Sequence, residues 1–189
     1  MARVQKKIRQ EKLKEKLLTT PFLTDEELAA YLKVSVQTIR LDRLELGIPE
    51  LRERTKQMAE EAQNKLKTIA SADVIGDLID LELGKSGISL MTVTPEMVFE
   101  KTKVARGHYI FAQANSLALA IIDAPLAVTG VANIKYKIAV REGEKLVAKA
   151  ENIKKRGNKY FIWVKTRNDS QEVFRAKFIM VSMDTDLPK

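Results

Sequence analysis

The sequence contains no cysteine and only one histidine among its 189 residues. The absence of cysteine excludes disulfides, thiolate catalysis and cysteine-ligated zinc, and it is typical of a reducing compartment. The longest uninterrupted apolar run, residues 117–122, is far too short to cross a bilayer, and the basic N-terminus has no apolar stretch of signal-peptide length. We therefore expect a cytoplasmic protein with no membrane partner, metal or cofactor.

The residues that are present indicate a folded protein with two basic surfaces. An apolar fraction of 45% is enough for a real core, and the length allows one ordinary domain plus a smaller one. Residues 1–16 hold seven Lys or Arg against two acids, and residues 135–167 hold eleven against three. The first surface, with Lys6 and Lys7, suits DNA phosphates; the second fits either a phosphorylated small molecule or ordinary solvated charge.

Residues 1–47 predict a helix-turn-helix DNA-binding domain. A first helix is expected over residues 6–18, and a capping box formed by Thr24 and Glu27 begins the second. Ser35 then caps a third helix over residues 36–46. The apolar residues expected to face the core are Ile8, Leu13, Leu17, Leu18, Leu28, Ala29, Leu32, Val36, Ile39 and Leu44.

The third helix carries side chains suited to reading DNA, because Gln can bind adenine edges, Arg guanine edges, and Thr a phosphate or a thymine methyl. Those expected to point outward are Gln37, Thr38, Arg40 and Arg43. The alternative is that Arg40 and Arg43 pair with Asp42 and Glu45 on a solvated face, for about 0.2–0.5 kcal/mol each. Residues 35–42 read Ser-x-x-Thr-Ile-Arg-x-Asp, which resembles the recognition helix of DeoR-type bacterial repressors, so we favour DNA binding.

Residues 48–70 are predicted to form an amphipathic linker helix. Gly47 ends the preceding helix, and Pro49 occupies a first-turn position. The helix is expected over residues 50–69, with an apolar stripe made of Leu51, Thr55, Met58, Ala62, Leu66 and Ile69. This stripe needs a partner, either the same helix in a second subunit or the flank of the following domain. A homodimer would present two recognition helices to a symmetric operator.

Residues 71–189 predict a strand-rich domain built round one buried helix. Residues 105–123 are apolar nearly all round, and such a helix must be buried. One strand is expected before it, over residues 88–94, and four after it, over 125–140, 145–155, 159–166 and 172–182, with a bulge near Gly130 and turns at Gly143 and Gly157. An antiparallel sheet round one apolar helix is the hotdog architecture. The predicted fold class is therefore α+β, with a helix-turn-helix, a linker helix and a C-terminal hotdog domain.

The start of the buried helix is the strongest candidate site. Arg106 precedes Gly107, a glycine lets a ligand approach the backbone, and helix N-termini hold anions. The alternative is that Arg106 only pairs with Asp80, Glu96 or Glu100. We interpret this junction as an anion-binding site in a sensor domain, and we give His108 no catalytic role.

Segments from the whole chain together resemble the FapR family, malonyl-CoA-responsive repressors of bacterial fatty acid and phospholipid synthesis. They read Thr24-Asp-Glu-Glu-Leu-Ala, Val36-Gln-Thr-Ile-Arg-Leu-Asp-Arg-Leu-Glu-Leu, Ile48-Pro-Glu-Leu-Arg-Glu-Arg, Ile79-Asp-Leu-Glu-Leu, Ala105-Arg-Gly-His and Phe111-Ala-Gln-Ala-Asn-Ser-Leu-Ala. The resemblance implies a repressor that binds operator DNA as a homodimer and is released by malonyl-CoA as its effector ligand.

The resemblance also implies roles at the site. Phe99 would line the acyl end, Gly107 would offer its N–H to the thioester or carboxylate, and Asn115 would hold the site together from within the helix. Lys135 and its basic neighbours could meet the CoA phosphates. The chemistry of Arg106 agrees, because malonyl-CoA differs from acetyl-CoA by one carboxylate, which a guanidinium can recognise by a bidentate charge-assisted bond.

The alternative function is a hotdog-fold acyl-CoA thioesterase, which would need an Asp or Glu at the helix. Residues 109–122 contain no acid, so we expect no enzyme. Residues 84–86, Gly-Lys-Ser, look like the end of a phosphate loop, but the required glycine five places earlier is Ile79. A constitutive DNA-binding dimer without a ligand would leave the junction of Arg106 and Gly107 unexplained.

Overall fold

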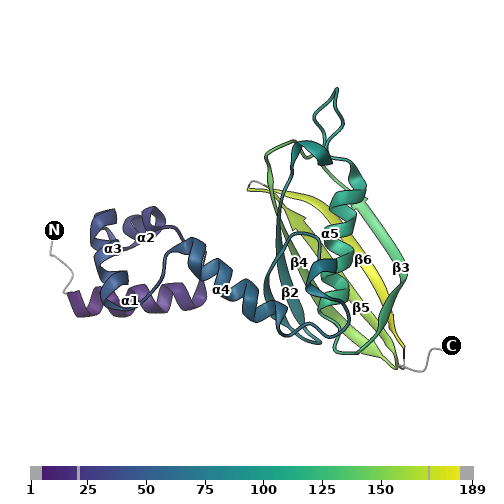
Figure 1. Cartoon of the computed structure of the whole chain (residues 1–189), viewed down its shortest axis with the longest axis horizontal. Coiled ribbons are helices and arrows are strands. Elements are labelled where there is room, and N and C mark those ends of the chain that lie inside the picture. Colours follow the sequence, from purple (N-terminus) through teal and green to yellow (C-terminus); the bar gives the residue numbers. More distant parts are fainter. Residues whose placement is uncertain (1–5, 21, 170, 184–189) are drawn as a thin grey trace. The chain divides into compact units, whose positions relative to one another are not determined.

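The computed structural model describes residues 6–20, 22–169 and 171–183 (Figure 1). Residues 1–5 of the predicted basic N-terminus and the predicted break at Pro21 lie outside these ranges. Contacts divide the chain into two compact units, residues 1–58 and 59–189. The division falls inside one helix, α4 (Leu51–Gln63).

The first unit contains the three predicted short helices, α1 (Lys6–Thr19), α2 (Asp25–Leu32) and α3 (Val36–Glu45). The capping box is confirmed, since the amide of Glu27 donates to Thr24 Oγ1 at 3.2 Å and the amide of Thr24 donates to Glu27 Oε2 at 2.8 Å. Ser35 caps α3 by accepting from the amide of Thr38 at 3.2 Å. The buried apolar residues are Leu13, Leu17, Leu28, Ala29, Leu32 and Ile39.

Three of the predicted inward residues in this unit are instead exposed: Ile8, Leu18 and Leu44, with exposed fractions of 46%, 84% and 75%. In two cases the neighbouring charged residue is buried in their place, Arg9 beside Ile8 and Arg43 beside Leu44. Apolar character alone therefore gave the wrong inward face, because each buried arginine has an acidic partner from another helix.

The linker helix α4 is shorter than the predicted range of residues 50–69, since it ends at Gln63. Of the predicted stripe, Ala62 is buried and the other members are partly buried. Leu66 and Ile69 lie beyond the helix, and both pack against the core of the second unit. The C-terminal end of the stripe is therefore covered by the second unit, but it is not helical.

The second unit is a six-stranded antiparallel sheet in the order β1-β2-β4-β5-β6-β3, with helix α5 (Gly107–Ala120) lying across one of its faces (Figure 1). The strands are β1 (Asp77–Glu82), β2 (Ser86–Thr92), β3 (Ala127–Tyr136), β4 (Lys145–Arg156), β5 (Lys159–Arg167) and β6 (Glu172–Ser182). Two short 3-10 turns, Ser71–Asp73 and Pro95–Met97, precede β1 and follow β2. The predicted α+β class with a sheet around a buried helix is confirmed.

Strand β1 was missed by sequence reasoning. Its burial does not alternate, because Leu78 and Ile79 are both buried and the pairing with β2 shifts register between Leu78 and Asp80. The predicted bulge in β3 is confirmed by a register shift between Thr129 and Val131, on either side of Gly130. Strand β2 begins at Ser86, two residues earlier than predicted.

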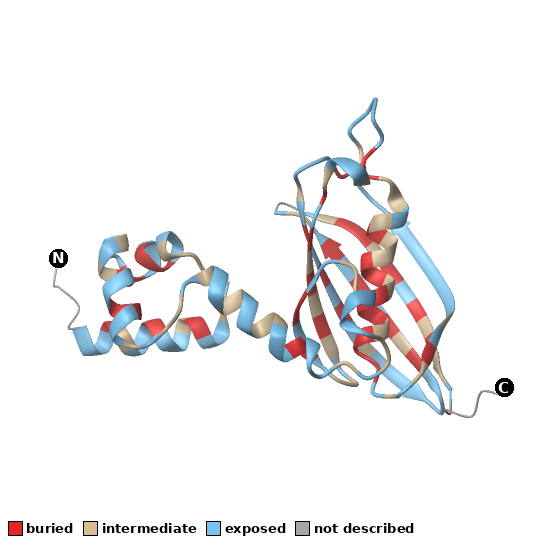
Figure 2. Ribbon diagram, viewed as in Figure 1, coloured by how far each residue is buried: buried red, intermediate tan, exposed pale blue. Residues whose placement is uncertain are grey.

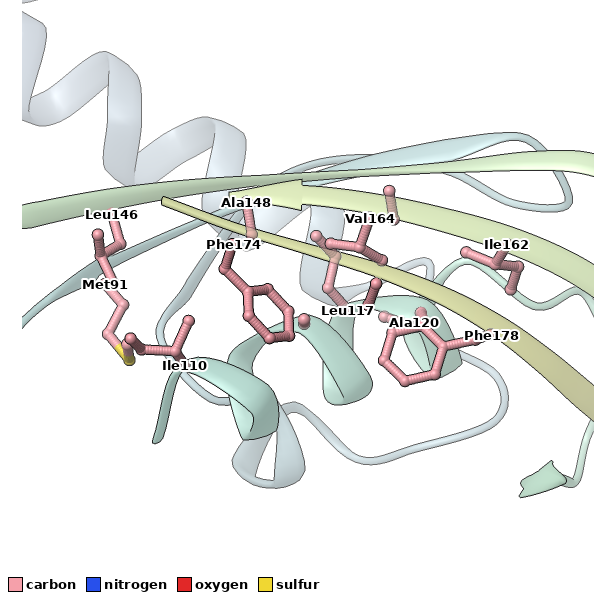
Figure 3. Packing of buried hydrophobic residues seen from close by; sticks show 14 of the residues in the cluster. Met91, Ile110, Leu117, Ala120, Leu146, Ala148, Ile162, Val164, Phe174 and Phe178 are labelled. Carbon is pink, nitrogen blue, oxygen red and sulfur yellow. The ribbon is translucent and has the colours of Figure 1, made fainter. Parts of the chain in front are cut away.

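The core of the second unit lies between α5 and the inner face of the sheet (Figures 2 and 3). Leu117 from α5 is fully buried. Side chains from the sheet are also fully or almost fully buried: Leu146, Ile162, Phe174 and Phe178. Removing such side chains from water contributes about 1.5–3 kcal/mol each, which makes α5 a fixed element. The start of α5 is therefore held in a defined position against the sheet.

The edge strand β3 differs from the central strands because most of its residues are exposed. Its exposed apolar side chains are Val128, Val131, Ile134 and Tyr136. An edge strand with this composition is ready to pair with another chain. Within the described residues, no helix has the length and apolar character needed to cross a membrane.

Candidate DNA-reading helix and anion-binding pocket

The helix α3 presents Gln37 and Arg40 to solvent, as predicted, with Thr38 partly covered. The side chain of Arg40 is 56% exposed, and its Nε lies 3.6 Å from Asp25 Oδ2. The hydroxyl of Thr38 shares a 2.9 Å hydrogen bond with the hydroxyl of Ser35. These side chains stand at the start and middle of α3, where a recognition helix meets base edges.

Arg43 does not point outward, so this part of the prediction is wrong. Its Nε and its terminal nitrogen donate to the two carboxylate oxygens of Asp25 at 2.7 and 2.8 Å, and it also donates to the carbonyl of Ile48 at 3.1 Å. Burial disfavours the charged form of Asp25, but the bonds from Arg43 outweigh this and hold the pKa of Asp25 below its usual value. Arg43 therefore fixes α3 to the start of α2.

A second buried ion pair joins α3 to α1. Arg9 donates to Asp42 from Nε at 2.5 Å and from a terminal nitrogen at 3.0 Å, and both residues are buried. Burial alone would raise the pKa of Asp42. The hydrogen bonds from Arg9 and Gln10 outweigh this effect, so the pKa of Asp42 lies below its usual value. The alternative pairing of Asp42 with Arg40 or Arg43 is not found among the described residues.

Sequence reasoning missed Arg9, Gln10 and Asp25 as residues that position the recognition helix. The sequence contained a signal for this contact. Donors recur three or four residues apart on the first helix, at positions 6, 9 and 10, and acids three apart on the third, at positions 42 and 45, so each set lies on one helix face. Lys6, predicted to contact DNA, bonds to Glu45 at 2.7 Å, whereas Lys7 is exposed. Both stay predictions as phosphate contacts.

A pocket of about 310 Å³ lies at the start of α5. One wall is formed by Val104, Ala105, Gly107 and Ile110, and the other by residues 136–140, at and after the end of β3. The first turn of α5 contains no acidic residue, so the partial positive charge of this helix end is not neutralised locally. Gly107 therefore lies at a cavity, while Arg106 is not among the residues that line it; the anion-binding role of this junction stays a prediction.

Arg106 is the N-cap residue of α5, and its amide donates to the carbonyl of Met97 at 2.8 Å. One terminal nitrogen donates to the backbone carbonyl of Glu96, and the guanidinium lies 5.2 Å from the centre of the Tyr109 ring. The buried Nε has no hydrogen-bond partner in the described part of the chain. No ion pair with Asp80, Glu96 or Glu100 is found there either, so this cation retains the capacity to bind an anion.

Tyr136 lines the pocket from the side of β3, a role that sequence reasoning missed. Its hydroxyl donates to the carbonyl of Gly107 at 2.8 Å, and burial raises the pKa of this phenol above its usual value, so it stays a donor. A Cβ on Gly107 would lie 2.9 Å from the Tyr136 ring. Gly107 therefore lets the Tyr136 ring lie against the start of α5. The two residues are 29 positions apart, so a single sequence does not reveal this contact.

The other predicted site residues are not gathered at this pocket. Phe99 is 55% exposed in the segment between Val98 and Ala105, and Asn115 accepts a 2.7 Å hydrogen bond from Thr129, which ties α5 to β3. Lys135 is paired with Arg175 on the face of the sheet away from α5. Of the predicted effector-site residues, only Gly107 lines the pocket; Arg106 directly precedes it as the N-cap of α5, and Phe99, Asn115 and Lys135 lie outside the pocket walls.

Comparison with solved structures identifies the fold of the second unit. An uncharacterized protein from Pyrococcus horikoshii has a TM-score of 0.59 with 25% identity, covering 64% of this chain and 93% of that one. A sigma28-regulated virulence protein from Campylobacter jejuni has a TM-score of 0.64 with 20% identity, covering 70% and 95%. The C-terminal domain is therefore a hotdog domain. Joined to a helix-turn-helix, it defines a DNA-binding transcription regulator.

Curated relatives narrow this class, although no family model matches the chain. The transcription factor FapR of Caldanaerobacter subterraneus subsp. tengcongensis is 60% identical over 187 residues, 99% of this chain and 94% of its own length. The transcription factor FapR of Bacillus subtilis is 47% identical over 178 residues, covering 93% and 95%. The chain belongs to the FapR family of transcription factors. This confirms the prediction of a DNA-binding repressor of fatty acid and phospholipid synthesis, and of a protein that is not an enzyme.

Proposed function

We propose that malonyl-CoA is the effector, and that it binds at the start of α5 and releases the repressor from the operators of lipid-synthesis genes. The observation that carries this proposal is the buried, unpartnered Nε of Arg106 beside a pocket at a helix N-terminus. A carboxylate placed there would satisfy that donor and meet the positive end of the helix.

The same observation explains how the site would distinguish malonyl-CoA from acetyl-CoA. Acetyl-CoA lacks the carboxylate and would leave the donor of Arg106 unsatisfied in a partly covered position, which costs about 1–3 kcal/mol, or a factor of about 5 to 150 in affinity. A hydrophobic pocket alone gives less discrimination against so small a difference. Gly107, with no side chain, would admit the acyl group to the helix backbone.

The protein would act as a cytoplasmic homodimer, with the exposed apolar edge of β3 as the surface that meets a second copy. Residues 1–47 would form the DNA-binding domain, 48–70 the linker and 71–189 the effector-binding domain. Gln37, Thr38, Arg40, Lys6 and Lys7 would contact the operator, while Phe99 and Asn115 would support the effector site. Release requires that the ligand favour one arrangement of the linkers by about 1–3 kcal/mol.

The test is fluorescence anisotropy of a labelled lipid-synthesis promoter fragment, titrated with malonyl-CoA and separately with acetyl-CoA. Release by malonyl-CoA alone is expected for the natural chain. Arg106→Ala should bind the fragment normally and resist malonyl-CoA, and Arg106→Lys, which keeps the charge but loses the forked geometry, should respond only at much higher ligand concentration. Binding that survives malonyl-CoA in the natural chain would overturn the effector assignment.

A further inference from the structure

The outer face of the sheet, away from α5, carries a row of four cations, of which only Lys135 has been considered above, as a possible contact of the CoA phosphates. Register pairs place Lys149 opposite Lys165, Lys165 opposite Arg175, and Arg175 opposite Lys135. Alternation puts them on the outer face, because their neighbours along the strands, such as Ala148, are buried under α5. We call Lys149, Lys165, Arg175 and Lys135 the cation row.

The cation row crosses four adjacent strands, β4, β5, β6 and β3, which lie side by side in Figure 1. Strands are about 4.8 Å apart, so the row spans about 14 Å. Like charges directly opposite each other destabilise a sheet, and three such pairs occur in succession here. An arrangement that costs stability in the free protein indicates a role in binding a partner of opposite charge.

The acidic residues nearest the row, Glu151 and Glu172, neutralise it only in part. Glu151 bonds to Lys149 at 2.9 Å, with both side chains at least half exposed, and Glu172 is paired with Lys137, a cation outside the row. Within the described ranges, Lys165, Arg175 and Lys135 make no ion pair. The next row adds a further cation, Lys177, held 4.5 Å over the exposed ring of Trp163.

We propose that the cation row is a second DNA-contacting surface, which binds phosphates without reading sequence. Duplex DNA carries one negative charge per about 1.7 Å of axis, a density that a 14 Å row of cations can match at several points. DNA held by α3 is tethered to the sheet through the continuous chain, so contacts that are weak alone gain from the high effective concentration. A row of cations on a flat sheet can bind the phosphates of DNA, but it does not enter a groove to contact the bases.

The test compares two full-length variants of equal charge change. Lys149→Gln/Lys165→Gln/Arg175→Gln removes most of the row and leaves Lys135, which is also a predicted CoA contact. Lys67→Gln/Lys85→Gln/Lys103→Gln is the matched control, because these exposed lysines of the same unit lie outside the sheet's outer face. Dissociation constants for the operator and for an unrelated duplex of equal length are measured between 50 and 200 mM salt.

The logarithm of the association constant falls linearly with the logarithm of the salt concentration. On both duplexes, this slope should be shallower by about 2 to 3 in the row variant, while the control keeps the slope of the natural chain. Over this fourfold change in salt, the natural chain should therefore lose about 16- to 64-fold more affinity than the row variant. Its preference for the operator, and its release by malonyl-CoA, should be unchanged, which separates this test from that of the effector.

Equal slopes in the row variant and the control would overturn the proposal. So would a row variant that keeps the natural slope but loses binding to phosphatidylglycerol vesicles that the natural chain retains, because the row would then serve a lipid surface. Thermal unfolding within a few degrees of the natural chain confirms that both variants are folded.

Discussion

Among single residues, Arg9 and Asp42 make the ion pair that most directly fixes α3, since both are buried and bonded through two nitrogens. Arg9→Met should lower the free energy of unfolding of the first unit by about 3–5 kcal/mol, because the carboxylate of Asp42 would be left buried without its partner. Adding Asp42→Leu should recover much of this loss. Hydrogen exchange of the α1–α3 amides measures both, and equal exchange in Arg9→Met and the natural chain would contradict the prediction.

Gly107 offers a test of the pocket that does not touch the guanidinium of Arg106. Gly107→Ala should weaken malonyl-CoA binding and leave DNA binding intact, because its Cβ would meet the Tyr136 ring at 2.9 Å and force this wall of the pocket to shift. Tyr136→Leu should relieve this clash, so a double-mutant cycle measured by calorimetry should show coupling of about 0.5 kcal/mol or more. Additive effects would mean that the two residues do not meet.

Acid should weaken the first unit through Asp25 and Asp42, whose pKa values are both lowered in the folded state. A lowered pKa contributes stability that is complete above the unfolded value of about 3.9 and is lost as the pH falls through the folded value. The free energy of unfolding should therefore be level from pH 7 to about pH 5 and fall steeply below about pH 4. Circular dichroism in urea checks this, with Asp42→Asn expected to fall less steeply.

At the scale of elements, the sequence predicted what is decided locally. The capping box at Thr24 and Glu27, the bulge at Gly130 and the turns at Gly143 and Gly157 depend on neighbouring residues, and the structure contains all of them. Strand β1 was missed because its register shift breaks the alternation that marks a strand. Leu44 was misplaced because the burial of Arg43 depends on Asp25, 18 residues away.

The same distinction applies to the site. Arg106 and Gly107 are adjacent in sequence, so their place at the start of a helix could be predicted, whereas the pocket that Gly107 lines depends on the end of β3. Tyr136 and the cation row result from strand pairing across the sheet, and a single sequence does not contain the order β1-β2-β4-β5-β6-β3. Lys135 was predicted as a possible contact of the CoA phosphates, and strand alternation places it on the face of the sheet away from α5.

The edge strand β3 leads to a prediction for the assembly. Val131 is 53% exposed on this edge, and Val131→Lys would place a charge where the second copy is proposed to pair. Sedimentation velocity should show the natural chain as a dimer and the variant shifted toward monomer by at least about 1.4 kcal/mol, or tenfold in dissociation constant. Val147→Lys, an exposed change on β4 away from either edge, is the control; a dimer unaffected by Val131→Lys would place the interface elsewhere.

For the whole molecule, the position of Tyr136 has a consequence for dosage in the cell. One strand, β3, both closes the pocket through Tyr136 and provides the edge proposed for pairing, and Asn115 ties the same strand to α5. Ligand affinity and subunit affinity are then linked, and each alters the other by the same factor. The malonyl-CoA level at which lipid genes switch on would therefore depend on how many copies of the repressor a cell contains, so that a cell could retune its response by changing expression alone.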